Sequence, residues 1–191
     1  MLMDEEKLIR SCLEGDRDAF GSLVAKYKVK VFNLTYSLTH NRETADDLAQ
    51  EVFLKAYTSL PSFRFKSGFG TWLYRITVNH ARDFLRKAKK MQTVPFSDGR
   101  WNEKTDTDPL DRRIQADVSQ RRRRMVRQVM RSLPEKHRTI LALRDLQGLS
   151  YEEIAKVLRI APGTVDSRLH RARKLLRIKL APLLSPHGEN S

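Results

Sequence analysis

The chain runs SYEEIAKVLRIAPGTVDSRLHRAR from Ser150 to Arg173, and this stretch predicts two helices separated by a tight turn. Ser150 and Glu153 have the spacing of a capping box, in which each side chain bonds a backbone N–H at a helix start. The apolar residues recur at helical spacing and define one inner face: Ile154, Ala155, Leu158, Val165, Leu169, Ala172 and Leu176. A short helix, a tight turn and a second helix together predict a helix-turn-helix.

The outer face of the second helix is basic, and its residues are Ser167, Arg168, His170, Arg171, Arg173 and Lys174. The second helix of this motif enters a DNA major groove with its N-terminal residues first. Arg168 and Arg171 suit bidentate contacts with guanine, whereas Arg173, Lys174 and Arg177 suit phosphates. The alternative is a basic amphipathic helix pair without a DNA role, but the cap, the turn and the inner face all favour the motif.

A second basic region combines positive charge with aromatic rings. A helix predicted from about Phe69 to Lys90 has one polar face: Thr71, Arg75, Asn79, Arg82 and Arg86. Trp72 is predicted at the edge of this face, and the preceding loop alternates aromatic and basic residues: Phe63, Arg64, Phe65 and Lys66. Rings stack on unpaired bases while arginines hold phosphates, and such a loop can receive a flipped base. The alternative is that Trp72 and Phe69 are half-buried core residues and the charges are solvated.

A third surface is suited to protein and not to DNA. The helix predicted over residues 43–60 shows Asp47, Gln50, Glu51 and Leu54 at positions i, i+3, i+4 and i+7. Acidic groups around an exposed leucine favour a basic protein partner, although a solvated face with one stray leucine is the alternative. No histidine completes a metal site with these acids, and no nucleophile–base pair or glycine-rich phosphate loop occurs. We therefore expect no metal, no cofactor and no catalytic residue.

Composition agrees with a nucleic-acid partner. The 191 residues carry a net charge of +14 with 40% hydrophobic residues; the charge is +7 over residues 58–90 and +11 over residues 121–191, and −2 in each remaining segment. The single cysteine, Cys12, excludes an internal disulfide, and we expect a buried structural thiol. The sequence has neither a membrane-spanning apolar run nor the plan of a signal peptide, which predicts a cytoplasmic protein.

The predicted fold is all-α, with two small helical domains joined by a flexible linker and the helix-turn-helix in the second. Helices are expected from Asp16, as N-cap, to about Thr39, then over about 43–60, 69–90, 114–132, from Pro134 to about Gly148, and from about Gly163 to Leu180. The domain boundaries are 1–90 for the first domain, 91–117 for the linker, 118–185 for the second domain and 186–191 for a disordered tail. Pro182 is expected to lie in a frayed end.

Four motifs in this order resemble the extracytoplasmic-function (group IV) sigma factors of bacterial RNA polymerase. DDLAQEVFLKAY (46–57) resembles the polymerase-binding segment of that family, and FGTWLYRITVNHARD (69–83) resembles its promoter-melting and −10-reading helix. LPEKHR (133–138) with SYEEIA (150–155) resembles the start of the −35-reading domain, and GTVDSRLHRAR (163–173) resembles its recognition helix. Asp166 and Ala161 depart from the residues common in the family, so the −35 sequence is not specified by the resemblance.

The resemblance implies a role for each surface. Asp47, Gln50, Glu51 and Leu54 would bind the polymerase core. The −10 element would be opened and read as single strand by Phe63, Arg64, Lys66, Trp72, Arg75, Asn79 and Arg82. The −35 element would be read as duplex by Thr164, Ser167, Arg168, Arg171 and Lys174.

The resemblance also implies partners and a location. The protein would be a non-enzymatic specificity subunit that binds polymerase core and promoter DNA, with an anti-sigma factor as its inhibitor. It would be cytoplasmic, nucleoid-associated when active and held at the membrane only through such an inhibitor. Two other classes stay open on the residues alone: a stand-alone helix-turn-helix regulator, and a nuclease, for which Asp83 alone is an inadequate acidic cluster.

Overall fold

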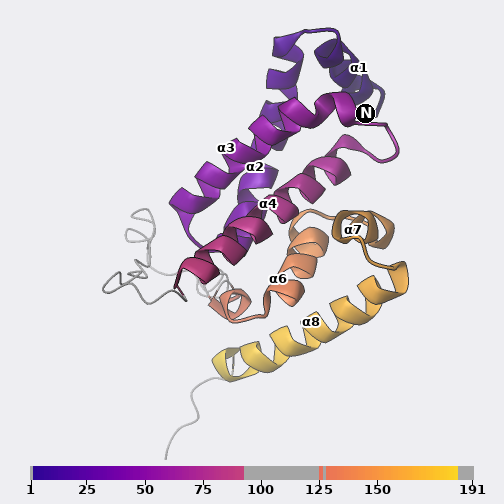
Figure 1. Ribbon diagram of the computed structural model, residues 1–191. Helices are drawn as coiled ribbons and strands as arrows, with labels where there is room; N and C mark the ends of the chain where they lie inside the picture. The colour runs from indigo at the N-terminus through magenta and orange to yellow at the C-terminus, as the bar shows by residue number, and fades with distance from the viewer. Residues whose placement is uncertain (1, 93–124, 127, 185–191) are drawn as a thin grey trace, which may run out of the picture.

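The computed structural model describes residues 2–92, 125–126 and 128–184, and in these ranges every regular element is helical (Figure 1). The all-α prediction is confirmed. No helix in the described ranges is long and apolar enough to cross a membrane. The predicted linker, apart from the last turn of the helix before it, lies outside the described residues, as does the tail 186–191.

The first half contains α1 (Leu2–Leu13), α2 (Arg17–Thr39), α3 (Arg42–Ser59), the 3-10 turn η1 (Leu60–Ser62) and α4 (Phe69–Gln92). Asp16 caps α2 as predicted, because its carboxylate accepts from the backbone N–H groups of Asp18 and Ala19. Asn41 caps α3 by accepting from Thr44 N at 2.8 Å. The chain reverses between α2 and α3 at His40, whose φ of 57° places it in the left-handed region.

The core of the first half lies among α2, α3 and α4. Leu23 and Val31 of α2, Val52 of α3, and Leu73 and Val78 of α4 are all fully buried. On α2 the buried residues Leu23, Tyr27, Val31 and Leu34 recur at four- and three-residue spacing, so this helix turns one apolar stripe inward. The helical spacing of Phe53 with Ala49 and Ala56 predicts that Phe53 is buried, but its side chain is only half-buried.

The second half contains α6 (Glu135–Leu141), the π-helical segment η3 (Ala142–Leu146), α7 (Tyr151–Leu158) and α8 (Pro162–Leu184). Most of the helix predicted over residues 114–132 lies outside the described residues. In the part that is described, residues 128–131 are helical. The capping box is confirmed: Ser150 N donates to Glu153 Oε2 at 2.8 Å, and Glu153 N donates to Ser150 Oγ at 3.2 Å. Gly148 follows η3 with a φ of 72°, which ends that segment as predicted.

Two expectations at helix ends are wrong. Pro134 is the N-cap of α6 and not its first helical residue. Pro182 was expected in a frayed tail, but α8 includes it and ends at Leu184. Pro182 has no N–H to donate within α8, but it lies in the last turn, where few helical bonds remain to be disrupted. The helix therefore tolerates the proline there.

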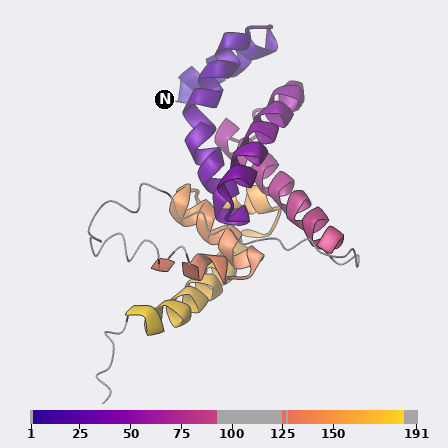
Figure 2. The same ribbon diagram turned by 90° about the vertical axis from the view of Figure 1, so that its left-hand side faces the viewer.

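The two halves pack directly on each other. Figure 1 shows α7 beside α4, and α6 between the first half and α8; the closest helix pairs across the boundary are α4 with α7 and α2 with both α6 and η3. Figure 2 shows the same stacking from the side, with α8 farthest from the first half. Buried residues of both halves form one continuous hydrophobic cluster, which includes Trp72 and Tyr74 from α4 and Ile154 from α7.

Candidate functional site

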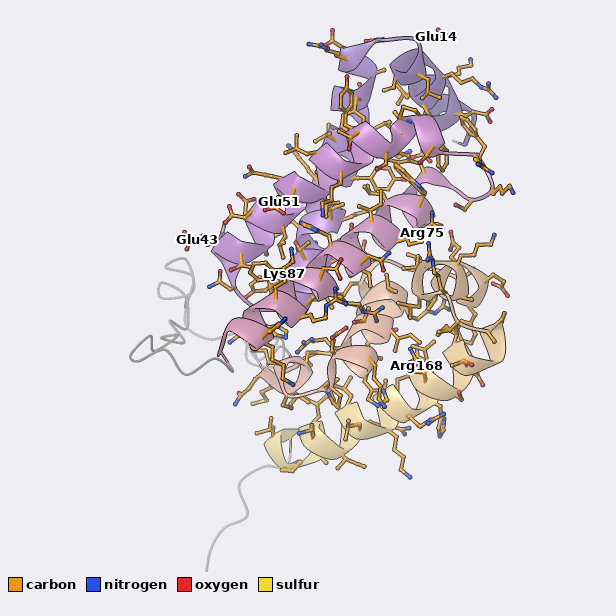
Figure 3. All side chains as sticks on the ribbon, in the orientation of Figure 1. Glu14, Glu43, Glu51, Arg75, Lys87 and Arg168 are labelled. Atoms are coloured by element: carbon orange, nitrogen blue, oxygen red, sulfur yellow. The ribbon has the colours of Figure 1, made fainter. Side chains whose placement is uncertain are left out.

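The candidate polymerase-binding face lies on the side of α3 that no other described helix covers. Asp47, Gln50, Glu51 and Leu54 are all exposed, and Leu54 is exposed to 68%. In Figure 3 the labelled Glu51 points away from α6, α7 and α8. Burial of Ala45, Leu48, Ala49, Val52 and Ala56 on the other side of α3 fixes this orientation.

Two features of this face were not predicted from the sequence. An apolar groove runs between α2 and α3 beside Leu54, and its lining includes Phe20, Val24, Phe53 and Tyr57. Phe20 and Val24 lie on the helical stripe of α2 that the spacing assigns to the core, so the pattern gives no sign that they line a surface. His80 of α4 contacts both the carboxylate of Glu51 and, at 2.7 Å, the ammonium group of Lys55. These contacts connect Glu51 and Lys55 of α3 to α4.

An aromatic cluster anchors the loop before α4. The ring centroid of Phe63 lies 5.3 Å from that of Trp72 and 6.1 Å from that of Phe69. Phe63 is buried, while Arg64 and Lys66 of the same loop are exposed. The loop therefore holds its basic side chains at the surface with a ring that is part of the core.

Trp72 is more buried than the sequence predicts. A position at the edge of the polar face of α4 was expected, but the side chain is only 7% exposed, with its ring 5.5 Å from that of Phe69. The core alternative left open by the sequence describes this arrangement. Trp72 becomes available to stack on a base only if the residues covering it move.

The polar face of α4 points at the second half of the chain. Thr71 Oγ1 donates to Glu153 Oε1 at 3.1 Å, and Arg82 Nε donates to Glu135 Oε1 at 2.8 Å. Thr71 is 5% exposed; Arg75, which Figure 3 labels between α4 and α7, is half-buried, whereas Asn79 is exposed. Acidic groups of the second half thus bond two residues of this polar face, and one of them, Arg82, is among the residues that the resemblance assigns to the −10 element.

The sequence does not predict the hydrogen bond between Thr71 and Glu153, because the capping box alone accounts for a glutamate at position 153. The sequence assigns it to the capping box, and the structure shows that its two carboxylate oxygens bond different partners. Glu135 belongs to the LPEKHR motif, in which nothing indicates a partner 53 residues earlier in the chain. Only the packing of the two halves brings these acids to α4.

The candidate duplex-binding face lies on α8. Val165, Leu169 and Ala172 are buried as predicted, with exposed fractions of 0 to 1%. On the outer side, Arg171 and Lys174 are exposed, while Thr164, Ser167 and Arg168 are half-buried. Arg171 Nε donates to the backbone oxygen of Ser167 at 3.2 Å, which holds the guanidinium along the helix.

Two arginines of α8 have neighbours that the sequence does not indicate. Arg173, expected at phosphates, donates to Asp145 of η3 at 3.0 Å, and this hydrogen bond raises the pKa of its guanidinium. Arg168 lies near His137 of α6, and the pKa of His137 is lowered by burial first and by the positive charges of Lys136, Arg168 and Arg171 as well. Figure 3 shows Arg168 on the side of α8 that faces α6.

Four buried side-chain atoms have no hydrogen-bond partner among the described residues: His40 Nε2, His137 Nδ1, Arg138 Nε and Gln147 Oε1. The pKa of His40 is lowered to about 3, by burial and by the nearby charges of Arg138 and Arg131.

Within the described ranges no group of three or more His, Cys, Asp or Glu residues is placed to hold a metal ion. Cys12 is half-buried, and burial together with the charge of Asp16 raises its pKa.

Known sequence families match both halves. The profile described as "Sigma-70 region 2" matches residues 23–91, and the one described as "Sigma-70, region 4" matches residues 123–176. The chain is 39% identical over 188 residues to the RNA polymerase sigma-H factor of Pseudomonas aeruginosa, with 94% of this chain and 95% of that protein covered. It is 37% identical to the ECF RNA polymerase sigma factor SigW of Bacillus subtilis, with 96% and 100% covered.

Solved structures resemble the whole chain as well. CnrH, in complex with the cytosolic domain of CnrY, matches with a TM-score of 0.69 and 26% identity over 95% of this chain and 99% of CnrH. The sigma factor RpoE of Bartonella quintana matches with a TM-score of 0.65 at 23% identity, over 85% of this chain and 96% of that one, which supports the fold alone.

Proposed function

Because this chain belongs to the extracytoplasmic-function sigma factors, which direct bacterial RNA polymerase to specific promoters, we propose that it reads its promoters with two faces. In this proposal α4 and the loop before it open the −10 element and read it as single strand, while α8 reads the −35 element as duplex. The observation that carries the proposal is that the segments matching regions 2 and 4 each present basic side chains, from α4 and from α8.

The −35 element is assigned to α8. Arg171 is exposed near the N-terminal half of the helix, where side chains of a recognition helix reach base edges. We assign base contacts to Arg168 and Arg171, and contacts with bases or nearby phosphates to Thr164, Ser167 and Lys174. The hydrogen bond between Arg171 and Ser167 supports this role, because it preorganises the guanidinium.

The −10 element is assigned to the loop before α4 and to the polar face of α4. The residues are Phe63, Arg64, Lys66, Trp72, Arg75, Asn79 and Arg82. Arg64, Lys66 and Asn79 are exposed and available as they stand, whereas Arg82 is bonded to Glu135. Single-stranded DNA must therefore displace Glu135 from Arg82, and Trp72 must part from Phe63 and Phe69, before these two residues can act.

The polymerase core is assigned to the outer face of α3. Asp47, Gln50, Glu51 and Leu54 form an acidic surface around an exposed leucine, and the apolar groove between α2 and α3 extends it. An interface with an apolar centre and a polar rim has the usual anatomy of a protein contact. We assign residues 1–90 to the −10 and core-binding domain, 91–117 to the linker and 118–185 to the −35 domain.

Regulation and location follow from this role. The protein acts as a specificity subunit and not as an enzyme, in the cytoplasm and on the nucleoid with the polymerase. An inhibitory protein partner, an anti-sigma factor, is part of the proposal, because the sigma factor RpoE of Bartonella quintana was solved in complex with the anti-sigma factor NepR. Such a partner can hold the protein at a membrane even though no helix among residues 2–92 and 128–184 could span one.

Transcription in vitro tests the proposal. Polymerase core supplemented with this chain is expected to start transcripts at a small set of promoters from genomic DNA of the source bacterium, whereas core alone starts none. Permanganate footprinting should find unpaired thymines at the −10 element, and DNase protection should extend over the −35 element. Transcripts without any common −35 sequence would refute the assignment of α8.

A further inference from the structure

We propose that α1 positions the DNA-opening site: through Glu5 and Tyr27 it caps the first turn of α4, and through Arg10 it holds the loop before α4. This inference rests on the proposed −10 role of α4. The region 2 profile begins at residue 23, after α1 has ended, so the family match gives α1 no role. Figure 1 shows α1 at the end of the molecule where the chain passes from α3 to α4.

The first turn of α4 lacks a side-chain cap of its own. The backbone oxygen of Gly68 accepts the first helical bond, from Trp72 N at 3.2 Å, which makes Gly68 the N-cap residue. The first N–H groups of a helix have no partner within it, and an N-cap side chain usually accepts from one of them. Glycine has no side chain to do so, and the acceptor must come from elsewhere.

Tyr27 of α2 supplies this acceptor. The Tyr27 hydroxyl lies directly against Gly70, since a Cβ added at Gly70 would lie 3.0 Å from Oη, and this position lets the hydroxyl accept from the backbone N–H of Gly70. The same hydroxyl donates to Glu5 Oε1 at 2.7 Å, and Lys26 Nζ lies 2.9 Å from that oxygen. Burial and this hydrogen bond raise the pKa of Tyr27, which keeps the hydroxyl protonated as a donor.

Glu5 orients the Tyr27 hydroxyl from α1 by accepting its hydrogen bond. Both residues are 7% exposed, so the contact is shielded from solvent. Lys26 balances the charge of the Glu5 carboxylate, which therefore acts as a hydrogen-bond acceptor that positions the phenol. The path from the carboxylate of α1 through the phenol of α2 to Gly70 of α4 fixes three helices at one point.

Arg10 holds the loop itself. Its guanidinium carbon lies 5.1 Å from the centroid of the Phe65 ring, and Glu6 pairs with Arg10 at 2.6 Å on the same helix. Phe65 has a φ of 55°, a conformation that bulky residues rarely adopt and that surrounding contacts must maintain. Arg64 and Lys66 flank Phe65, so this backbone geometry sets where their charges point.

The test measures promoter opening separately from polymerase binding. Holoenzymes with wild-type or variant chains are mixed with a promoter fragment, selected by the wild-type holoenzyme, that carries 2-aminopurine in the −10 element. Tyr27→Phe is expected to slow the rise of fluorescence about five-fold, the effect of losing one helix cap, with unchanged affinity for the core. Tyr36→Phe, farther along α2, is the matched control and should open at the wild-type rate.

A second substitution rescues the first. Gly68 has no positive φ and nothing within 4 Å of an added Cβ, so Gly68→Ser fits and supplies an N-cap hydroxyl. The double variant Tyr27→Phe with Gly68→Ser should regain most of the lost rate. Arg10→Gln changes an exposed side chain and should slow opening about two-fold, whereas Lys7→Gln on the same helix should not.

Three results would overturn the inference: Tyr27→Phe opens at the wild-type rate, the double variant stays as slow as the single one, or core affinity falls in the same proportion as the opening rate. If Tyr27→Phe does not fold, equal opening rates for Arg10→Gln and Lys7→Gln overturn it. A wild-type holoenzyme that opens no promoter would instead refute the proposed function.

Discussion

Arg82 Nε and Glu135 Oε1 lie 2.8 Å apart and join α4 to the first turn of α6. Arg82 is one of the residues we assign to the −10 element, so an acidic side chain of the second half stands where a phosphate would bind. An ion pair of this kind, with both partners partly exposed, stabilises a contact by about 0.2–1 kcal/mol. The pair is weak enough for DNA to replace it.

Glu135→Gln is therefore expected to strengthen binding of the free chain to a single-stranded −10 oligonucleotide, by up to about five-fold. The reason is that DNA no longer has to break the ion pair between Arg82 and Glu135 before it binds the guanidinium. Fluorescence anisotropy with a labelled oligonucleotide measures the affinity. Glu152→Gln makes the same change of net charge at an exposed position of α7 and serves as control. Equal gains for both variants would show a general charge effect.

Trp72 is predicted to change its surroundings when DNA binds. With Trp101 replaced by phenylalanine, the emission of the single remaining tryptophan reports on Trp72, which is 7% exposed within the aromatic cluster. We expect blue-shifted emission in the free chain and quenching when the ring stacks on a base of a −10 oligonucleotide. Unchanged emission in a complex that anisotropy shows to be formed would exclude stacking.

Arg171→Ala should weaken binding of the holoenzyme to −35 DNA by about 1–3 kcal/mol and relax specificity at the contacted base pair. The side chain is exposed, so the stability of the fold should not change. Competition with a set of single-base −35 variants measures both effects. Arg177→Ala, farther along α8, should weaken binding to all variants about equally. The same uniform loss for Arg171→Ala would remove its base-reading role.

Leu54→Ala should weaken the complex with polymerase core by about 1–2 kcal/mol, as expected for an apolar side chain at the centre of an interface. Leu54 is 68% exposed in the free chain, and thermal unfolding should be unaffected. Val29→Ala, at a position 60% exposed on α2, is a matched truncation outside the proposed face. Core affinities that do not differ between the two variants would contradict the assignment.

His40 makes the junction of the two halves sensitive to acid. Its pKa is lowered to about 3 in the folded chain, against an ordinary value of about 6.5, so protonation favours the unfolded state. The stability that neutral His40 contributes is complete above about pH 6.5 and is lost as the pH falls towards 3. Urea unfolding of wild type and His40→Asn at pH 7 and pH 5 measures this. Asparagine tolerates the left-handed φ of 57°, and the variant should lose less stability between the two pH values.

The sequence was sufficient wherever a local rule decides the structure. Asp16 and Ser150 accept backbone N–H groups as their cap positions predict, and the spacing of Val165, Leu169 and Ala172 gives their burial. These features depend on residues within one or two helical turns. Local rules failed at Pro182, where a helix continues through its last turn despite the proline.

What the sequence could not provide are contacts between distant segments. Helical spacing places Trp72 at the edge of a polar face, but its burial depends on Phe63, which reaches it from the preceding loop. Likewise, nothing local pairs Thr71 with Glu153, which lies 82 residues later. Such contacts follow from the tertiary arrangement and not from the periodicity of either helix.

The two carboxylate oxygens of Glu153 accept hydrogen bonds from different partners. Oε2 closes the capping box at Ser150, while Oε1 accepts from Thr71. Separation of the halves thus exposes Oε1 to water without taking anything from the start of α7. The start of α7 therefore keeps its complete capping box whether or not the helix-turn-helix lies against α4.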